Sequence, residues 1–285
     1  MQPHEIHELK ENLPYLLAGA ISSAVLLLLF SARRGLGRRL RPAGGPREPP
    51  LWGPGDVLLG VVAWIGLQLA AAPLLPSLGT TGADSLPDPR GQTLLQALTW
   101  LLTCGFVFLL VRRGPGQPLS TLGLRSPRWW SSVGFTLLVF TLSIYPIAAV
   151  MALWVVALHD LAGLDIAPQD SVALFRSIAE NDDIGAVAIL LVGGVIIAPV
   201  GEEIFFRGFI FGCFRERLGP LLGAVLSSFF FALLHLSLVA FAPLFLIGCI
   251  LCYILHRTES IYPAMLFHAI FNASTFWKLL GRPDE

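Results

Sequence analysis

Long apolar runs separated by short polar loops dominate this chain. A helix that crosses the hydrocarbon core of a bilayer needs about 20 mostly apolar residues. Runs of roughly this length predict spanning helices at residues 14–31, 55–76, 92–112, 130–157, 184–214, 219–237, 239–256 and 261–280. The pattern therefore predicts an all-α integral membrane protein with about eight transmembrane helices, in which the last five form a core. The 184–214 run is unusually long, and we expect it to be broken near Pro199-Val200-Gly201.

Composition supports a membrane location. Hydrophobic residues occupy 55% of the 285 positions and charged residues only 13%, and the mean hydropathy is +0.72. Because a soluble domain carries about 25% charged residues, this chain lacks the polar surface that contact with water on all sides requires. The formal net charge is zero, which by itself points to no acidic or basic partner. We therefore expect no nucleic acid as a partner, and the apolar composition makes membrane lipid an expected one.

The distribution of charge predicts an orientation in the membrane. Loops 32–54 and 113–129 and the turns after residues 214 and 255 carry basic residues, whereas the alternate loops are mostly acidic. Basic loops face the cytoplasm, which predicts a multi-pass protein of the cell inner membrane with its N terminus outside. The segment before the first apolar run is mixed in charge rather than basic. We therefore expect this run to be a retained helix and not a signal peptide.

Ionisable and amide side chains interrupt the apolar runs of the C-terminal half. A charged side chain at the bilayer centre costs about 2.5–3.5 kcal/mol on insertion scales, so such residues usually mark functional sites. With a rise of 1.5 Å per residue, Glu202, His235 and His268 lie about 20 Å, about 24 Å and about 16 Å from the predicted cytoplasmic ends of their helices. These similar depths predict one site, open to the cytoplasm, which includes the remaining polar residues of these runs: Glu203, Arg207 and Asn272.

Helical spacing suggests how the two glutamates differ. Glu203 and Arg207 are separated by four residues, so they lie on one helix face and can form an ion pair. Glu202 is rotated by about 100° from Glu203 and has no obvious partner in its own helix. Glu202 is therefore a candidate general base.

Two further pairs at this spacing involve histidine. His268 and Asn272 place an imidazole next to an amide, which can donate two hydrogen bonds to one oxyanion; alternatively, the histidine can bind a metal. Phe231 and His235 place an aromatic ring one turn from an imidazole. The pairs Gly208/Gly212 and Gly219/Gly223 have the small-residue spacing that lets membrane helices approach closely.

Three linked motifs resemble the CPBP family of intramembrane proteases, which includes the type II CAAX prenyl endopeptidases. The motifs are Glu202-Glu203-Ile204-Phe205-Phe206-Arg207, Phe231-Ala232-Leu233-Leu234-His235 and His268-Ala269-Ile270-Phe271-Asn272. The resemblance covers about residues 130–280. It divides the chain into N-terminal helices and basic loops at 1–128, which we interpret as a variable scaffold, and a protease core at 129–285.

The resemblance implies a role for each polar residue. Glu202 would activate the attacking water with help from His235, Arg207 would hold Glu203, and His268 and Asn272 would stabilise the oxyanion. The family is also described as metalloproteases, which would make Glu202, His235 and His268 zinc ligands. Two histidines and a carboxylate form a valid catalytic zinc set, but a buried Glu–His pair can also activate water without metal. Both possibilities stay open.

The expected activity is endopeptidase cleavage of a hydrophobic or prenylated, CAAX-like peptide within the membrane. Buried carboxylates and histidines also form proton relays, so a proton-coupled transporter is the alternative, although the chain shows no internal repeat of the kind common in transporters. A catalytically inactive membrane scaffold is the third possibility. The residues leave the oligomeric state open.

Overall fold

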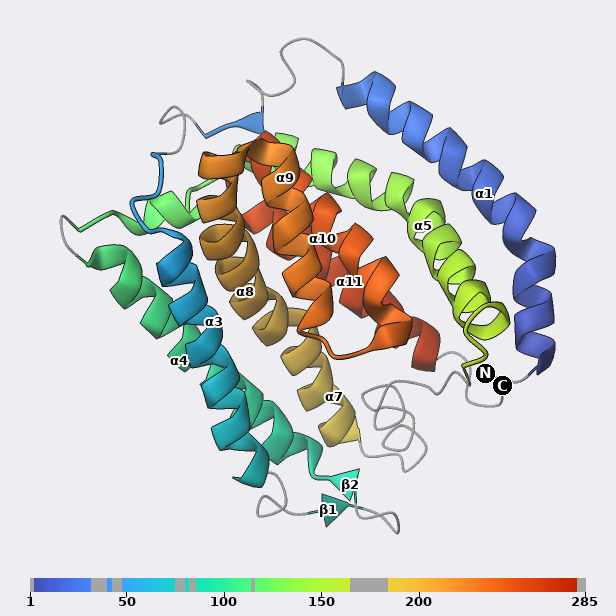
Figure 1. The fold of residues 1–285 in the computed structure, drawn as a ribbon, viewed down its shortest axis with the longest axis horizontal. Coiled ribbons are helices and arrows are strands. Elements are labelled where there is room, and N and C mark those ends of the chain that lie inside the picture. The colour runs from blue at the N-terminus through green and yellow to red at the C-terminus, as the bar shows by residue number, and fades with distance from the viewer. Residues whose placement is uncertain are drawn as a thin grey trace.

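The fold consists of long helices in the ranges that the computed structural model describes, which are residues 3–31, 40–42, 48–74, 80–81, 86–113, 116–164 and 184–280. On one side, α1 (Pro3–Ser31) lies along α5 (Trp129–Asp160), as Figure 1 shows. On the other side, α3 (Pro54–Ala71), extended by the 3-10 turn η1 (Ala72–Leu74), pairs with α4 (Pro89–Arg112). The strands β1 (Thr80–Thr81) and β2 (Leu86–Pro87) form a minimal antiparallel pair between them, and the 3-10 turn η3 (Leu119–Leu122) follows α4.

The centre of the molecule is formed by the C-terminal third of the chain. α7 (Ile184–Val192) leads into a π-helical turn, η4 (Gly193–Ile197), then α8 (Ala198–Glu202) and a second π-helix, η5 (Glu203–Ile210). α9 (Phe211–Leu233), α10 (Leu238–Thr258) and α11 (Tyr262–Leu280) complete it. α9 packs against both η5 and α10, while α11 contacts α5, α10 and η4.

The helix ends follow from local chemistry. α4 begins at Pro89, and the carboxylate of Asp88 accepts a hydrogen bond from the backbone N–H of Arg90, as is usual for an N-cap. Ser237 caps α10 in the same way through Ala240 N–H. Within α9, Gly219 has φ 81° and ψ 168°, so the chain turns there and doubles back. Glycine adopts this positive φ without a Cβ penalty.

The predicted fold class is confirmed: this is an all-α integral membrane protein. Among the described residues, six helical stretches are long and apolar enough to cross a membrane. The difference from the expected eight has two causes. The stretch Ile184–Leu233 counts once although it turns at Gly219, and α11 is too polar to count because it contains His268, Asn272 and Lys278.

The expected break near Pro199-Val200-Gly201 is wrong. Backbone angles stay in the right-handed helical region through Ile197, Ala198, Glu202 and Glu203. Pro199 directly follows the π-helical turn η4, in which the backbone N–H of Ala198 bonds to the carbonyl of Gly193, five residues back. The irregularity takes the form of two π-helices, one on each side of α8.

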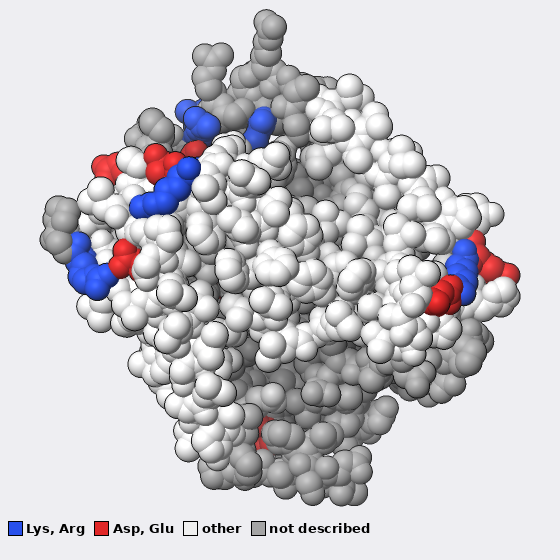
Figure 2. Space-filling view, in the orientation of Figure 1, with Lys and Arg blue, Asp and Glu red and all other residues white. Residues whose placement is uncertain are grey.

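Charged side chains gather at the ends of the helices. Figure 2 shows a broad uncharged surface with charged groups near its edges. At one end, Glu259 lies 3.4 Å from Arg215 and 3.8 Å from Arg41. At another, Lys10 pairs with Asp160 at 2.7 Å. Arg41 and Arg215 come from separate segments that were both predicted to be cytoplasmic, and their meeting agrees with a shared side.

Many of the charges behind the orientation prediction lie outside the described residues, among them Arg33, Arg34, Arg38, Arg39 and Arg47 of the basic loop and the acidic residues of 165–183. The predicted N-terminal location, the cytoplasmic opening and the choice of inner membrane therefore stay predictions.

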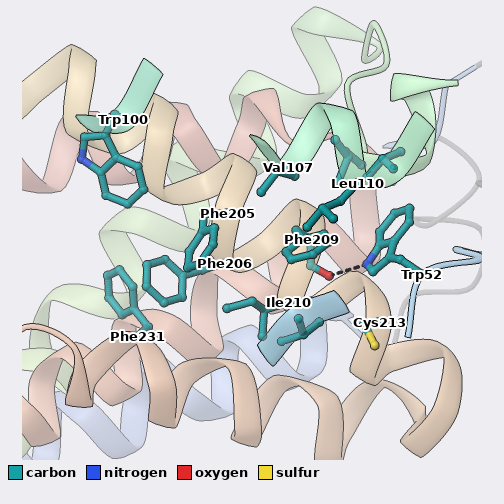
Figure 3. Packing of buried hydrophobic residues seen from close by; sticks show 13 residues of the cluster. Trp52, Trp100, Val107, Leu110, Phe205, Phe206, Phe209, Ile210, Cys213 and Phe231 are labelled. Carbon is teal, nitrogen blue, oxygen red and sulfur yellow. Dashed lines mark hydrogen bonds between the residues drawn. The ribbon is translucent and has the colours of Figure 1, made fainter. Parts of the chain in front are cut away.

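The main apolar core joins the N-terminal helices to the glutamate-bearing segment. Figure 3 shows Trp52 and Trp100 beside Phe205 and Phe209. Contact is close enough that a Cβ on Gly201 would lie 2.5 Å from the Trp100 ring. Residues 1–128 and 129–285 therefore share one hydrophobic core, and their division into scaffold and protease core stays a prediction.

Candidate active site

The second π-helix carries a buried ion pair. Nη1 of Arg207 lies 3.0 Å from Oε1 of Glu203, and their side chains are 1% and 0% exposed. The guanidinium also lies over the Phe231 ring, with Cζ 4.0 Å from its centroid, a favourable cation–π geometry. Pairing is necessary here because an isolated charge at this depth would be very costly. The predicted Glu203–Arg207 pair is therefore present.

His268 connects the two glutamates. Its Nδ1 lies 2.9 Å from Oε1 of Glu203, and its Nε2 lies 3.8 Å from Oε2 of Glu202. An ionised carboxylate only accepts hydrogen bonds, so Nδ1 is the donor to Glu203. Nε2 is then directed toward Glu202, and the orientation of this imidazole is fixed by the Glu203–Arg207 pair behind it.

Glu202 lies between two imidazoles. Its Oε2 is 3.9 Å from Nε2 of His235 and 3.8 Å from Nε2 of His268. This oxygen is buried, and no hydrogen-bond donor among the described residues reaches it. Distances near 3.9 Å are too long for direct hydrogen bonds, but one small molecule such as water can lie between such groups.

His235 is the most accessible member of the cluster, with 31% of its side chain exposed against 13% for Glu202. It lies in the turn that follows α9, beyond the end of the helix at Leu233. Its Nδ1 lies 2.6 Å from the carbonyl oxygen of Phe231, and its ring meets the Phe231 ring edge-to-face at 4.6 Å. The carbonyl accepts from Nδ1–H, which leaves Nε2 of a neutral His235 free to accept a proton.

Asn272 lies one turn beyond His268 on α11, and its amide makes a contact that the sequence did not predict. Its Nδ2 donates a hydrogen bond of 2.8 Å to the carbonyl of Gly194 in the first π-helix. An amide nitrogen carries two hydrogens, so one remains for another acceptor. The Gly193-Gly194 pair was the available signal, because glycine lets another helix approach the backbone closely.

Close side-chain contacts thus link five of the six predicted site residues: Glu202, Glu203, Arg207, His235 and His268. Asn272 instead donates a hydrogen bond to Gly194 of the π-helical turn η4.

The glycines of the predicted close-packing pairs differ in their surroundings. A Cβ on Gly208 would lie 2.9 Å from the Leu122 carbonyl oxygen and one on Gly223 2.7 Å from Arg215 N, whereas Gly219 forms the turn.

Zinc ligation was the open alternative for Glu202, His235 and His268. Within the part of the chain that the structure describes, no group of three or more His, Cys, Asp and Glu side chains is arranged to hold a metal ion. Oε2 of Glu202 lies 3.9 Å and 3.8 Å from the Nε2 atoms of His235 and His268, and zinc ligation by these residues stays a prediction.

Comparison with known proteins gives this geometry a context. Residues 184–274 match the family model described as type II CAAX prenyl endopeptidase Rce1-like. Over these residues the chain is similar to that family. It is also similar to a protein of Bacillus subtilis (strain 168) named "Putative membrane peptidase YdiL", with 24% identity over 211 residues, which cover 72% of this chain and 80% of that protein. No solved structure matches the chain significantly.

The matched segment starts at α7 and ends within α11, so it contains all six predicted site residues. The comparisons support the suggested resemblance and, at the family level, a membrane peptidase. The segments that carry Trp52 and Trp100 lie outside the family match, although both residues pack against the glutamate-bearing helix.

Proposed function

We propose that this protein is an intramembrane endopeptidase that hydrolyses a peptide bond in a hydrophobic or lipidated, CAAX-like substrate. The observation that carries the proposal is the position of Glu202 Oε2, 3.9 Å and 3.8 Å from two imidazole Nε2 atoms. A water molecule between them would contact a base and be directed by two histidines. The family relationship supports peptide hydrolysis as the reaction.

The chemistry follows from these groups. Glu202 takes a proton from the water while the water oxygen attacks the scissile carbonyl carbon. His235 assists by accepting a hydrogen bond from the same water. The bond formed is C–O, and the carbonyl oxygen becomes an oxyanion. The proton then passes to the leaving amine nitrogen as the C–N bond breaks, which yields a carboxylic acid and an amine.

His268 and Asn272 are the proposed oxyanion donors. Nδ1–H of His268 is engaged by Glu203, so Nε2 donates to the oxyanion only when the imidazole is protonated. Such a protonated ring would balance the second carboxylate, because two glutamates share a single arginine at this site. Asn272 would supply the amide hydrogen that Gly194 does not use. Removal of one oxyanion donor typically costs about 10²–10³ in kcat.

The decisive experiment is cleavage of quenched peptides by the purified protein in detergent, with a prenylated peptide beside its unprenylated form. Glu202→Gln keeps the shape of the side chain and removes the base, so we expect kcat to fall by about 10²–10⁴. Glu216→Gln is the matched control, because Glu216 is an exposed glutamate outside the site.

The outcomes separate the alternatives. Cleavage that is lost in Glu202→Gln and kept in Glu216→Gln would support the peptidase. A strong zinc chelator, followed by added zinc, tests metal dependence in the same assay. If no peptide is cleaved but liposomes show proton uptake that depends on Glu202, the proposal is wrong and the site is a proton relay.

A further inference from the structure

Trp52 lies just before α3 and far from the glutamates in sequence, yet it contacts the helix that carries them. Its side chain is buried, and its indole Nε1 donates a hydrogen bond of 3.0 Å to the carbonyl oxygen of Phe209, shown as a dashed line in Figure 3. The two rings are stacked, with centroids 5.7 Å apart and an interplanar angle of 24°. Trp52 therefore contacts Phe209 twice, through a hydrogen bond to the Phe209 backbone carbonyl and through stacking on the Phe209 ring.

Phe209 lies near the C-terminal end of the π-helix η5, which begins at Glu203. π-helices are rare and are frequently found at functional sites. Relaxation of this segment to a regular α-helix would shift the helical register across it by about one residue. It would therefore rotate Glu203 by about 100° relative to α9. The contact of Glu203 with His268 of α11 could not survive that rotation.

Side chains from outside η5 donate hydrogen bonds to two of its backbone carbonyls. Ser227 of α9 donates to Phe206 O at 3.0 Å, and Trp52 donates to Phe209 O. Phe206 O also accepts from the backbone N–H of Phe211, five residues ahead. Donors from outside the helix therefore help to fix the π-helical register.

Trp52 is itself held in place. The amide of Gln117 accepts a hydrogen bond from Leu51 N–H at 2.7 Å and donates one to Pro49 O at 2.8 Å. This side chain therefore clamps the extended segment just before Trp52. A continuous series of contacts leads from Gln117 through Trp52 and Phe209 to the helix of the glutamates.

We propose that Trp52 is a positioning residue for the active site: its indole N–H fixes the π-helix η5 and thereby the placement of Glu202 and Glu203 against the histidines. The catalytic part of this inference rests on the proposed peptidase function. It gives the segment before α3, outside the family match, a specific task in the reaction.

Trp52→Phe tests the proposal, because it keeps an aromatic ring against Phe209 while it removes the N–H donor together with part of the buried indole ring. We expect kcat to fall about tenfold with KM unchanged, since small misplacements of catalytic groups are costly. Gln117→Leu, which releases the clamp, should act in the same direction. Trp130→Phe is the matched control, because Trp130 is 92% exposed, and it should behave like the wild type.

Hydrogen–deuterium exchange supplies a readout that does not need activity. In Trp52→Phe, exchange should rise in residues 203–212 and stay unchanged in α5 and α10. Unchanged exchange and unchanged kcat would overturn the proposal. A uniform rise in exchange across all helices would also overturn it, because that result indicates a general loss of stability.

The same experiment separates this inference from the proposed function. If the wild type cleaves no peptide, the peptidase proposal fails, and exchange in 203–212 still decides whether Trp52 fixes the π-helix. If the wild type is active and Trp52→Phe matches it in both readouts, the positioning role fails alone.

Discussion

Arg207 is fully buried, and its environment explains how a charge is tolerated there. It contacts Glu203 at 3.0 Å and the face of Phe231 at 4.0 Å, while Glu203 also binds His268. The arginine therefore supports the imidazole that faces Glu202, without being positioned for the chemistry itself. Its contribution depends on the carboxylate that it neutralises.

Arg207→Met should destabilise the protein by about 3–5 kcal/mol, because it leaves Glu203 buried without its counter-charge. Unfolding in mixed micelles of increasing SDS content measures the loss. The double variant Glu203→Gln/Arg207→Met removes both charges and should recover part of this loss. Equal stability of the single and double variants would contradict this explanation, because the loss would then not come from an unpaired Glu203 carboxylate.

At the scale of elements, the glutamate-bearing helix is fixed by close contact with helices of both halves of the chain. Gly201 packs on Trp100 of α4, and Gly194 packs on Phe276 of α11, where an added Cβ would lie 2.7 Å from the ring. These contacts position α8 between α4 and α11. Gly194 lies in the π-helical turn η4 and Gly201 in α8, so both belong to the segment in which α-helix and π-helix alternate.

Gly201→Ala should cost about 1–3 kcal/mol, the usual range for overpacking a tight core, and should lower kcat because Gly201 directly precedes Glu202. Gly66→Ala in α3 is the matched control, since nothing lies within 4 Å of its added Cβ. We expect it to be neutral or slightly stabilising. Folding and activity assays on both variants check this, and equal behaviour of the two would contradict the packing argument.

At the scale of the whole molecule, the opposite ends of α5 provide a test of orientation. Arg128 precedes α5, and Leu161, which is 87% exposed, follows it. If the basic loops face the cytoplasm, a membrane-impermeant maleimide should label Leu161→Cys in right-side-out vesicles. It should label Arg128→Cys only after permeabilisation. The unsubstituted protein controls for its four native cysteines.

The opposite labelling pattern would show that the protein has the reverse orientation in the membrane, with its N terminus in the cytoplasm. The depth argument for a cytoplasmic opening would then fail as well, because it was counted from the basic ends of the helices. Labelling of both sites from outside would indicate that α5 does not span the membrane.

Much of the fold was predictable because membrane helices are encoded by the length of apolar runs. The run 92–112 corresponds to α4 at Pro89–Arg112, and the run 239–256 to α10 at Leu238–Thr258. The π-helices were not predictable, because no hydrophobic period distinguishes them over one or two turns. The expected helical position of His235 was also wrong, since α9 ends at Leu233.

The sequence by itself determined the all-α membrane class and the identity of the buried polar residues. It also determined the Glu203–Arg207 pair, because each of these depends on local polarity or on spacing within one helix. Only the tertiary structure decided that His268 joins both glutamates, that Glu202 faces two imidazoles and that Asn272 binds Gly194. These contacts join separate helices, so they depend on the rotation that the π-helices impose and on packing against α4 and α11. Neither property is encoded in any single segment.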